Sequence, residues 1–497
     1  MSRQGGDPRV VGVESADGSG PTGRRWWAAA GLLALAGFAV RLVYVAVHEY
    51  DPSITDANWY VNAANLLADG RGFVDPLVYM REGVSVPGAL HPPGYTVVMA
   101  IPSLFGITGT FGHQIWSSMI GTATVLVVAL VARRLAGPRA GLLAAAVAAL
   151  YPWFWLHDST LMSENLAMLL AAILLLLSYR FWDRPTTWGA MLIGLILGIA
   201  VLTRSETLSL LVFLALPLVA FRRDQPWRRR LGWYATIAGS MVLVLAPWVG
   251  YNLSRFDEPV YVSISENALL VGNCSDVYEG PLIGSWSMGC VTAAMCPDRE
   301  PDDVEDCIWS RDPRQDVSNL APDLRRAALR NIGDNIERMP AVVVAREGRT
   351  WSFFRPNDQI VLDSYYTQFP HGVLRWGLVS YYGMVLGCIA GLVVLRRRHV
   401  PVFPLLALAL SVASAVGVAF GETRYRAVAE VPLVVGAAIG LDALWPVAAS
   451  RIRRATDAWR NSRTGQPDVA DETATVAHHD AAEVVGAPST TGGSGDN

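Results

Sequence analysis

The feature that most constrains this chain is a series of long apolar runs separated by short polar gaps. Ten runs are long enough, or nearly long enough, to cross a lipid bilayer. They lie at residues 26–47, 113–132, 140–156, 160–179, 187–203, 207–221, 231–250, 374–395, 400–420 and 427–446. Hydrophobic residues make up 52% of the 497 positions and charged residues 17%, which is more apolar than a soluble globular chain tolerates. We therefore expect an all-α polytopic membrane protein with about ten transmembrane helices.

The basic residues indicate how these helices are oriented. All 40 of them are arginine, and with a cytoplasmic N-terminus every cluster between the apolar runs falls on the cytoplasmic side. The clusters are Arg133, Arg134 and Arg139; Arg180 and Arg184; and residues 222–230, 396–398 and 451–454. This orientation requires the segment His91–Phe105, which is short and contains Pro102, to lie at the outer face without spanning. Both termini are then cytoplasmic, and the polar tails 1–25 and 451–497 are expected to be disordered.

Two long outer segments interrupt the predicted membrane domain, which covers residues 26–446. The first is 48–112 and the second is 251–373, where we expect small helices on the membrane surface, including one over 320–338. A second surface helix follows residue 340, with Trp351, Phe353 and Phe354 as interfacial anchors.

The second outer segment also contains four of the five cysteines. Cys274, Cys290, Cys296 and Cys307 are an even set on the oxidising side, so we expect two disulfides in a small outer domain. Three pairings remain open. A zinc site is the alternative, but the spacing contains no CxxC pair and we predict no metal.

Charged and polar residues gather at the outer ends of the apolar runs. Charges at membrane depth are costly and are usually retained for pathways or sites, so we expect them to meet in one outer cavity. The candidates are Asp56, His91, Glu164, Arg204, Glu206, Glu422, Arg424, Tyr425 and Arg426. A carboxylate can take the proton from an acceptor hydroxyl while arginine holds a departing phosphate, and arginine can supply the charge stabilisation that a metal supplies elsewhere. This combination suits glycosyl transfer from a lipid phosphate without a cofactor.

Each candidate also has a structural interpretation. Asp56 and Glu164 can be helix caps, and Arg204 and Glu206 can be a local ion pair. Residues 424–426 can anchor a helix at the membrane interface. His91 before two prolines can simply end the loop.

The order of these pieces resembles the C superfamily of membrane glycosyltransferases, in particular the bacterial relatives of protein O-mannosyltransferases and of the lipid A aminoarabinose transferase. The resemblance covers roughly residues 26–446. It rests on residues 56–73 (DANWYVNAANLLADGRGF), 91–95 (HPPGY), 161–166 (LMSENL), 198–206 (GIAVLTRSE) and 424–426 (RYR), with 247–256 (PWVGYNLSRF) and 263–273 (SISENALLVGN) similar to the start of the large outer loop of that family.

The resemblance implies that Asp56 is the catalytic base and that the donor is a polyprenyl-phosphate monosaccharide, used with inversion. Arg204, Arg424, Arg426, Tyr425, Glu164 and His91 are then expected to bind the carrier phosphate or the substrate. Two departures matter. Many relatives have a pair of acids in the first outer loop, whereas Ala57 and Asn58 follow Asp56 here, and His91 stands where some relatives have lysine.

The predicted activity is an inverting hexosyl- or pentosyltransferase at the outer face of a bacterial plasma membrane. Its partners are a lipid-linked sugar donor, membrane lipid, and an acceptor that is a glycan, a lipid or a protein. A transporter or flippase for lipid-linked cargo is one alternative, although the chain has no convincing internal repeat. A polymerase or ligase for cell-envelope polysaccharide is another. The net charge of -3 and the short basic clusters predict no nucleic-acid partner.

Overall fold

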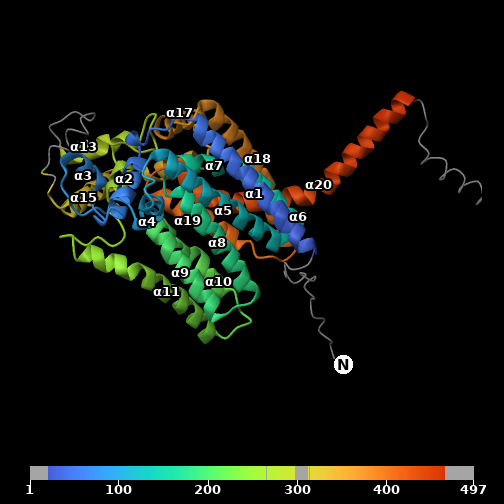
Figure 1. The fold of residues 1–497 in the computed structure, drawn as a ribbon, viewed down its shortest axis with the longest axis horizontal. Helices are drawn as coiled ribbons and strands as arrows, with labels where there is room; N and C mark the ends of the chain where they lie inside the picture. Colours follow the sequence, from blue (N-terminus) through green and yellow to red (C-terminus); the bar gives the residue numbers. More distant parts are fainter. Residues whose placement is uncertain (1–20, 265, 297–311, 313, 465–497) are drawn as a thin grey trace, which may run out of the picture. The chain divides into compact units, whose positions relative to one another are not determined.

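The computed structural model of the chain is helical throughout its regular structure (Figure 1). It describes residues 21–464 except 265, 297–311 and 313. Within these ranges there is no strand, and an isolated bridge pairs Val74 with Pro87. One compact unit ends at Asp442, and a second unit begins at Ala443. The expected all-α class is therefore confirmed.

Helices occupy all ten of the expected apolar runs. Six helices are long and apolar enough to cross a membrane: α1 (Pro21–Val47), α5 (Thr110–Ala136), α8 (Glu164–Asp183), α11 (Trp227–Leu253), α18 (His371–Arg397) and α20 (Ala427–Thr464). The apolar part of α20 lies within Thr423–Pro446. The helices α6 (Pro138–Leu150) and α7 (Pro152–Ser159) form a pair bent by 49°. Three apolar runs are shorter: α9 (Thr187–Thr203), the stretch Ser205–Ala220, and α19 (Phe403–Val418). The middle one consists of η2 (Ser205–Ser209), η3 (Leu211–Ala215) and α10 (Leu216–Ala220). Length and composition thus support six or seven full spans among the described helices, with three shorter apolar helices beside them.

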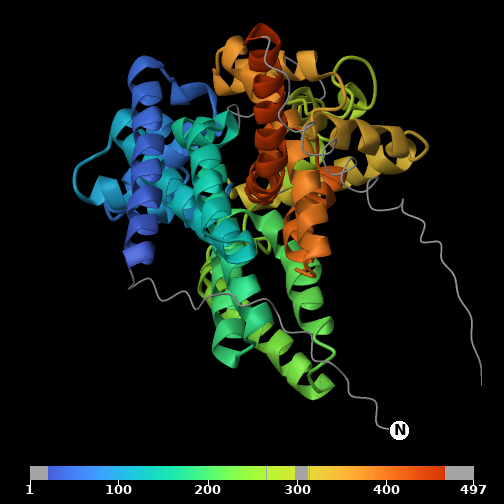
Figure 2. The same cartoon turned by 90° about the vertical axis from the view of Figure 1, so that its right-hand side faces the viewer.

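Small residues allow neighbouring helices of this bundle to approach closely. In α18 and α20 the pairs Gly387 and Gly391, and Gly436 and Gly440, have the four-residue spacing of a membrane helix contact. A Cβ atom placed on Gly391 would lie 2.0 Å from the carbonyl oxygen of Gly436, and one on Gly440 would lie 2.1 Å from that of Gly387. The helices α9 and α11 also lie side by side, as both views show (Figures 1 and 2).

A buried ion pair ties the first transmembrane helix to the bent pair. The guanidinium of Arg41 in α1 contacts the carboxylate of Asp158 in α7, and their side chains are 0% and 2% exposed. Asn165 of α8 donates to the same carboxylate and also, at 3.1 Å, to the carbonyl oxygen of Ser117 in α5. The sequence offers no role for Asp158. In the structure it links four helices.

The two outer segments form short helices. The first contains η1 (Pro52–Ile54), α2 (Asp56–Ala68), α3 (Pro76–Glu82) and α4 (Pro93–Leu104). With 12 residues, α4 is too short to cross a bilayer, as expected for this segment. The second contains α12 (Glu266–Val271), η4 (Ser275–Val277), α13 (Gly289–Met295), η5 (Val317–Leu320), α15 (Ala321–Asp334), α16 (Met339–Thr350) and α17 (Pro356–Thr367). The surface helices expected after residues 320 and 340 correspond to α15 and α16.

The second outer segment has its own small core, stabilised by a disulfide and by buried arginine. Cys274 and Cys290 are bonded, which removes both from any zinc site. Cys296 is also in a disulfide, and Cys307 lies outside the described residues. Arg346 is fully buried and donates to the carbonyl oxygens of Gly272 at 2.6 Å and Gly417 at 2.8 Å. Its planar group therefore binds carbonyl oxygens at the C-terminal ends of α12 and α19, where the helix leaves its last carbonyls unpaired.

Two details of the outer and C-terminal regions differ from expectation. Residues 451–464 continue α20 as helix, because no glycine or proline interrupts this arginine- and alanine-containing stretch before Gly465. Of the three expected interfacial anchors, Phe353 is exposed, whereas Trp351 is half-buried and donates to Glu347 at 2.8 Å. Phe354 is half-buried beside Gly348.

The contact between α18 and α20 can be tested with a matched pair of glycines on α18. Gly391→Ala is expected to destabilise the protein by about 1–3 kcal/mol, because the added methyl group meets the backbone of α20. Gly383→Ala is the control, since a Cβ atom there meets nothing within 4 Å. Thermal unfolding in detergent should show a lower midpoint only for Gly391→Ala. Equal midpoints would contradict the close contact.

Candidate functional site

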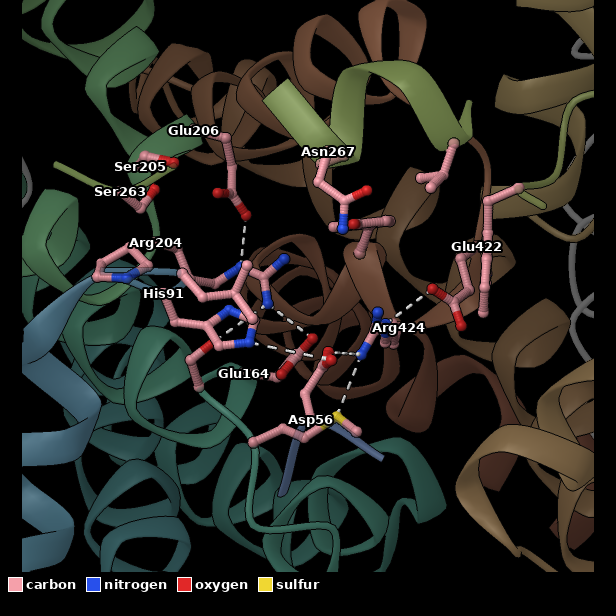
Figure 3. A pocket seen from close by; sticks show the side chains of 18 of the residues that line it. Asp56, His91, Glu164, Arg204, Ser205, Glu206, Ser263, Asn267, Glu422 and Arg424 are labelled. Carbon is pink, nitrogen blue, oxygen red and sulfur yellow. Dashed lines mark hydrogen bonds and ion pairs between the residues drawn. The ribbon is translucent and has the colours of Figure 1, made fainter. Parts of the chain in front are cut away.

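A cavity of about 310 Å³ lies where the first outer segment, the starts of α8 and η2, the second outer segment and the loop before α20 meet (Figure 3). Such a volume is at the lower end of the range for small-molecule sites. Its walls contain six of the seven residues that the sequence singles out for binding or catalysis. These are Asp56, His91, Glu164, Arg204, Arg424 and Tyr425.

Asp56 is the first residue of α2 and faces the cavity. Thr55 is the N-cap of this helix, since its side chain accepts from the amide of Ala57 at 3.3 Å. Capping therefore does not occupy Asp56, whose side chain is 41% exposed. Its Oδ2 accepts a hydrogen bond from Nη1 of Arg424 at 3.0 Å, and its Oδ1 lies 3.9 Å from Nε2 of His91. Figure 3 shows these three side chains converging.

The surroundings of Asp56 favour its charged form. Desolvation opposes ionisation, but the guanidinium of Arg424, with a smaller contribution from His91, holds the pKa of the Asp56 carboxyl below its ordinary value. Burial lowers the pKa of His91, so this imidazole is neutral at pH 7. Its ring stacks on Tyr60 with centroids 4.7 Å apart. Asp56 is thus an ionised carboxylate with an open side, which a general base requires.

Arg424 is shared between two acids of different character. Its Nε donates to Oε2 of Glu422 at 2.7 Å while Nη1 reaches Asp56. The Glu422 side chain is only 5% exposed, and burial raises the pKa of this carboxyl in spite of Arg424. Of the two acids, Asp56 is therefore the more accessible and the more readily ionised.

Arg204 occupies a parallel position on the other side of the cavity. It follows the last residue of α9, and its Nη1 lies 2.6 Å from Oε1 of Glu164 and 3.3 Å from Oγ of Ser163. Its Nε contacts the carboxylate of Glu206. Both guanidinium groups lie near the ring of Tyr425, with Cζ of Arg204 at 5.2 Å and Cζ of Arg424 at 5.7 Å from its centroid.

Acidic groups outnumber guanidinium groups in this cavity. Asp56, Glu164, Glu206 and Glu422 line it together with two arginines. Any phosphate that binds here must therefore compete with carboxylates for guanidinium donors.

The described residues contain one cluster of three potential metal ligands with closely spaced donor atoms, Cys274, Asp276 and Cys290. The two cysteines of this cluster form the disulfide.

Arg426 does not fit the predicted substrate-binding role. It is 1% exposed, forms an ion pair with Glu430 at 2.5 Å, and donates to the carbonyl oxygen of Thr350 at 2.9 Å and to Oγ of Ser352 at 2.8 Å. The reason is local geometry. Residues 423–426 form the 3-10 turn η6, and with about three residues per turn, positions two apart point in different directions. Arg424 therefore faces the cavity while Arg426 joins the outer segment to α20.

Part of the cavity lining, called the neutral wall below, carries no charge, and sequence reasoning missed it. It is formed by residues of the second outer segment and the loop after α19, namely Ser263, Ile264, Asn267, Ala268, Val271, Trp286, Met288, Tyr366 and Phe420. These residues carry no charge, and they come from four separate stretches of the chain. The only available signal was the SISENALLVGN stretch that begins at residue 263.

The electrostatic description of Asp56 can be tested by chemical labelling. A carbodiimide modifies protonated carboxyl groups, so the pH midpoint of Asp56 labelling, followed by mass spectrometry, reports its pKa. In the native protein this midpoint should lie below the ordinary value of 3.8. Arg424→Gln should move it to higher pH, because the dominant positive neighbour is removed. Arg139→Gln, a change of an exposed arginine outside the cavity, should leave it in place. A midpoint unaffected by Arg424→Gln would contradict the ion pair.

Comparison with known families supports the resemblance seen in the sequence. Residues 90–251 match the family model described as dolichyl-phosphate-mannose-protein mannosyltransferase. The likeness to that family is thereby confirmed over this region, which contains His91, Glu164, Arg204 and Glu206 but neither Asp56 nor Arg424. A comparison with curated protein sequences gave no match.

Solved structures of two other proteins resemble the chain at low identity. The oligosaccharyltransferase of Archaeoglobus fulgidus in its apo form is 14% identical, with a TM-score of 0.46 and coverage of 93% of this chain and 54% of that one. The chain thus spans about half the length of the archaeal protein. ArnT from Cupriavidus metallidurans bound to undecaprenyl phosphate is 17% identical, with a TM-score of 0.39 and coverage of 85% and 79%.

Proposed function

We propose, from the family match over residues 90–251 and from the arrangement of the cavity, that this protein is an integral-membrane inverting glycosyltransferase. It moves a monosaccharide from a polyprenyl-phosphate donor to an acceptor hydroxyl at the outer face of a bacterial plasma membrane. Both termini are cytoplasmic in this proposal. The observation that carries it is the contact between Asp56 and Arg424, which places an accessible carboxylate 3.0 Å from a guanidinium donor in one cavity.

These two groups supply what the displacement requires. The carboxylate of Asp56 accepts the proton of the acceptor hydroxyl as its oxygen bonds to the anomeric carbon from one face. The bond between that carbon and the phosphate oxygen breaks on the opposite face, so configuration inverts and polyprenyl phosphate leaves with the electron pair. Arg424 and Arg204 stabilise the charge that grows on the departing phosphate. The proton remains on Asp56 until product leaves.

Donor binding also activates the base in this scheme. In the empty cavity Arg424 holds the pKa of Asp56 down, which makes this carboxylate a weak base. When the donor phosphate takes donors from Arg424, Asp56 loses part of that stabilisation and gains a negative neighbour. Both changes raise its pKa toward the range in which proton abstraction is efficient. The pairing with Arg424 thus keeps Asp56 a weak base until a phosphate enters.

The alternatives fit the cavity less well. A flippase needs a continuous path for its cargo, whereas the charges here meet in one cavity and are satisfied by one another. A polysaccharide polymerase or ligase must hold an oligosaccharide on the carrier, whereas the family model that matches residues 90–251 is described by a donor that carries a single mannose. The sugar, hexose or pentose, is not fixed by these contacts.

Transfer in liposomes tests the function. The protein is reconstituted with synthetic polyprenyl-phosphate hexoses and pentoses, each radiolabelled in the sugar, and release of label from the carrier is measured. Asp56→Asn should reduce transfer by at least about 10²-fold, because general-base catalysis contributes roughly 10²–10⁴-fold. Asp69→Asn, which changes an acid at the far end of the same helix, should retain activity. Movement of intact donor across the bilayer without sugar release would support the flippase instead.

A further inference from the structure

The neutral wall of the cavity contains a continuous row of aromatic rings. Tyr366 and Trp286 have centroids 4.6 Å apart, Trp286 and Phe420 are 6.3 Å apart, and Phe420 and Tyr425 are 5.1 Å apart. All four residues line the cavity. The row ends at Tyr425, beside both cavity arginines. It therefore leads from the second outer segment to the proposed position of the phosphate.

Polar groups without partners accompany these rings. Oδ1 of Asn267 is buried and has no hydrogen-bond partner among the described residues. A buried amide oxygen in this state costs free energy unless a ligand or water satisfies it. Asn267 lies between Glu206 and Glu422 in the view of the cavity (Figure 3). The wall thus offers aromatic faces together with an amide and hydroxyl groups.

The wall is held as one unit. The disulfide between Cys274 and Cys290 spans the segment that contains Trp286. The amide of Ser287 donates to the carbonyl oxygen of Val271 at 2.9 Å, which fixes Trp286 against α12 and hence against Asn267. The amide of Gly421 donates to the carbonyl oxygen of Gly284 at 2.8 Å and joins this unit to the loop that carries Glu422. A preorganised surface of this kind binds a rigid ligand at low entropic cost.

We infer that the acceptor of the proposed transferase is a carbohydrate hydroxyl, and that the acceptor sugar lies on Trp286 and Tyr366 with its polar edge toward Asn267. A sugar ring presents C–H groups on its faces and hydroxyl groups around its edge, which matches flat rings beside an amide. The inference rests on the proposed function and adds the acceptor class to it.

Two other occupants of this wall fit less well. A polyprenyl chain must remain among the apolar spans, whereas Trp286 and Tyr366 belong to the outer segment between α11 and α18. An extended peptide is held mainly through its main chain at a strand edge or through a helix groove. The described part of the wall has short helices and side chains and contains no strand.

Binding and turnover together test this inference. The binding probes are methyl glycosides of mannose, glucose and arabinose, followed by saturation-transfer NMR with Asp56→Asn protein, which needs no turnover. Sugar signals are expected, they should fall strongly in protein that also carries Trp286→Ala, and Trp286→Phe should restore them. Trp188→Ala is the control, because Trp188 is 64% exposed and does not line the cavity.

The turnover arm uses wild-type protein with a polyprenyl-phosphate donor and either the same glycosides or short peptides containing serine and threonine. Trp286→Ala should raise the KM for the glycoside about tenfold while kcat changes less. Sugar binding that does not depend on Trp286, or peptides that accept the sugar where glycosides do not, would overturn the inference and leave the transferase function intact. Failure of donor turnover with every acceptor, while Trp286-dependent sugar binding persists, would overturn the function instead.

Discussion

The arrangement of Arg424 between Asp56 and Glu422 is the constraint on which the site depends. Charged groups at the edge of a lipid bilayer are expensive unless they are paired, and here one guanidinium satisfies two carboxylates from opposite ends of the chain. The pairing brings the start of α2 against the turn before α20. Arg204 repeats the device with Glu164 and Glu206. These paired groups line one cavity, and in the proposed mechanism a phosphate replaces the carboxylates as the partner of the arginines.

The rest of the outer region holds the two walls of this cavity in place. The charged residues Glu164 and Arg204 belong to the transmembrane part of the chain, where the buried pair of Arg41 and Asp158 joins α1 to α7 shortly before α8, which begins at Glu164. The neutral wall rests on a small disulfide-bonded core in which Arg346 binds the backbone carbonyls of Gly272 and Gly417. Arginine is therefore a partner for carboxylates in the cavity and in buried pairs outside it, and a partner for backbone oxygen in the outer core.

Much of this organisation could be predicted from the sequence because lipid imposes strong rules. Apolar runs gave the helices, and interruptions by charge at their outer ends gave Asp56, Glu164, Arg204 and Arg424. The burial of each charged side chain, and the direction in which it points, could not be predicted. Arg424 and Arg426 are nearly adjacent and chemically identical, yet a tight turn sends one into the cavity and the other toward Glu430. The neutral wall was missed because its residues carry no charge and come from separate stretches of the chain. Asn267 lies in α12, Tyr366 in α17, and Trp286 in the loop before α13.

In the proposed mechanism Asp56 and a carrier phosphate compete for Arg424, and this competition can be measured as the binding of polyprenyl phosphate to Asp56→Asn. The substitution removes a carboxylate that both occupies Arg424 and repels an anion. Polyprenyl phosphate should therefore bind several-fold more tightly to Asp56→Asn than to the native protein, as measured by calorimetry in nanodiscs. Carrier binding should thus increase although sugar transfer is lost. Arg424→Gln in the same assay should bind more weakly. Weaker binding by Asp56→Asn would contradict the account, because Asp56 would then help to hold the carrier.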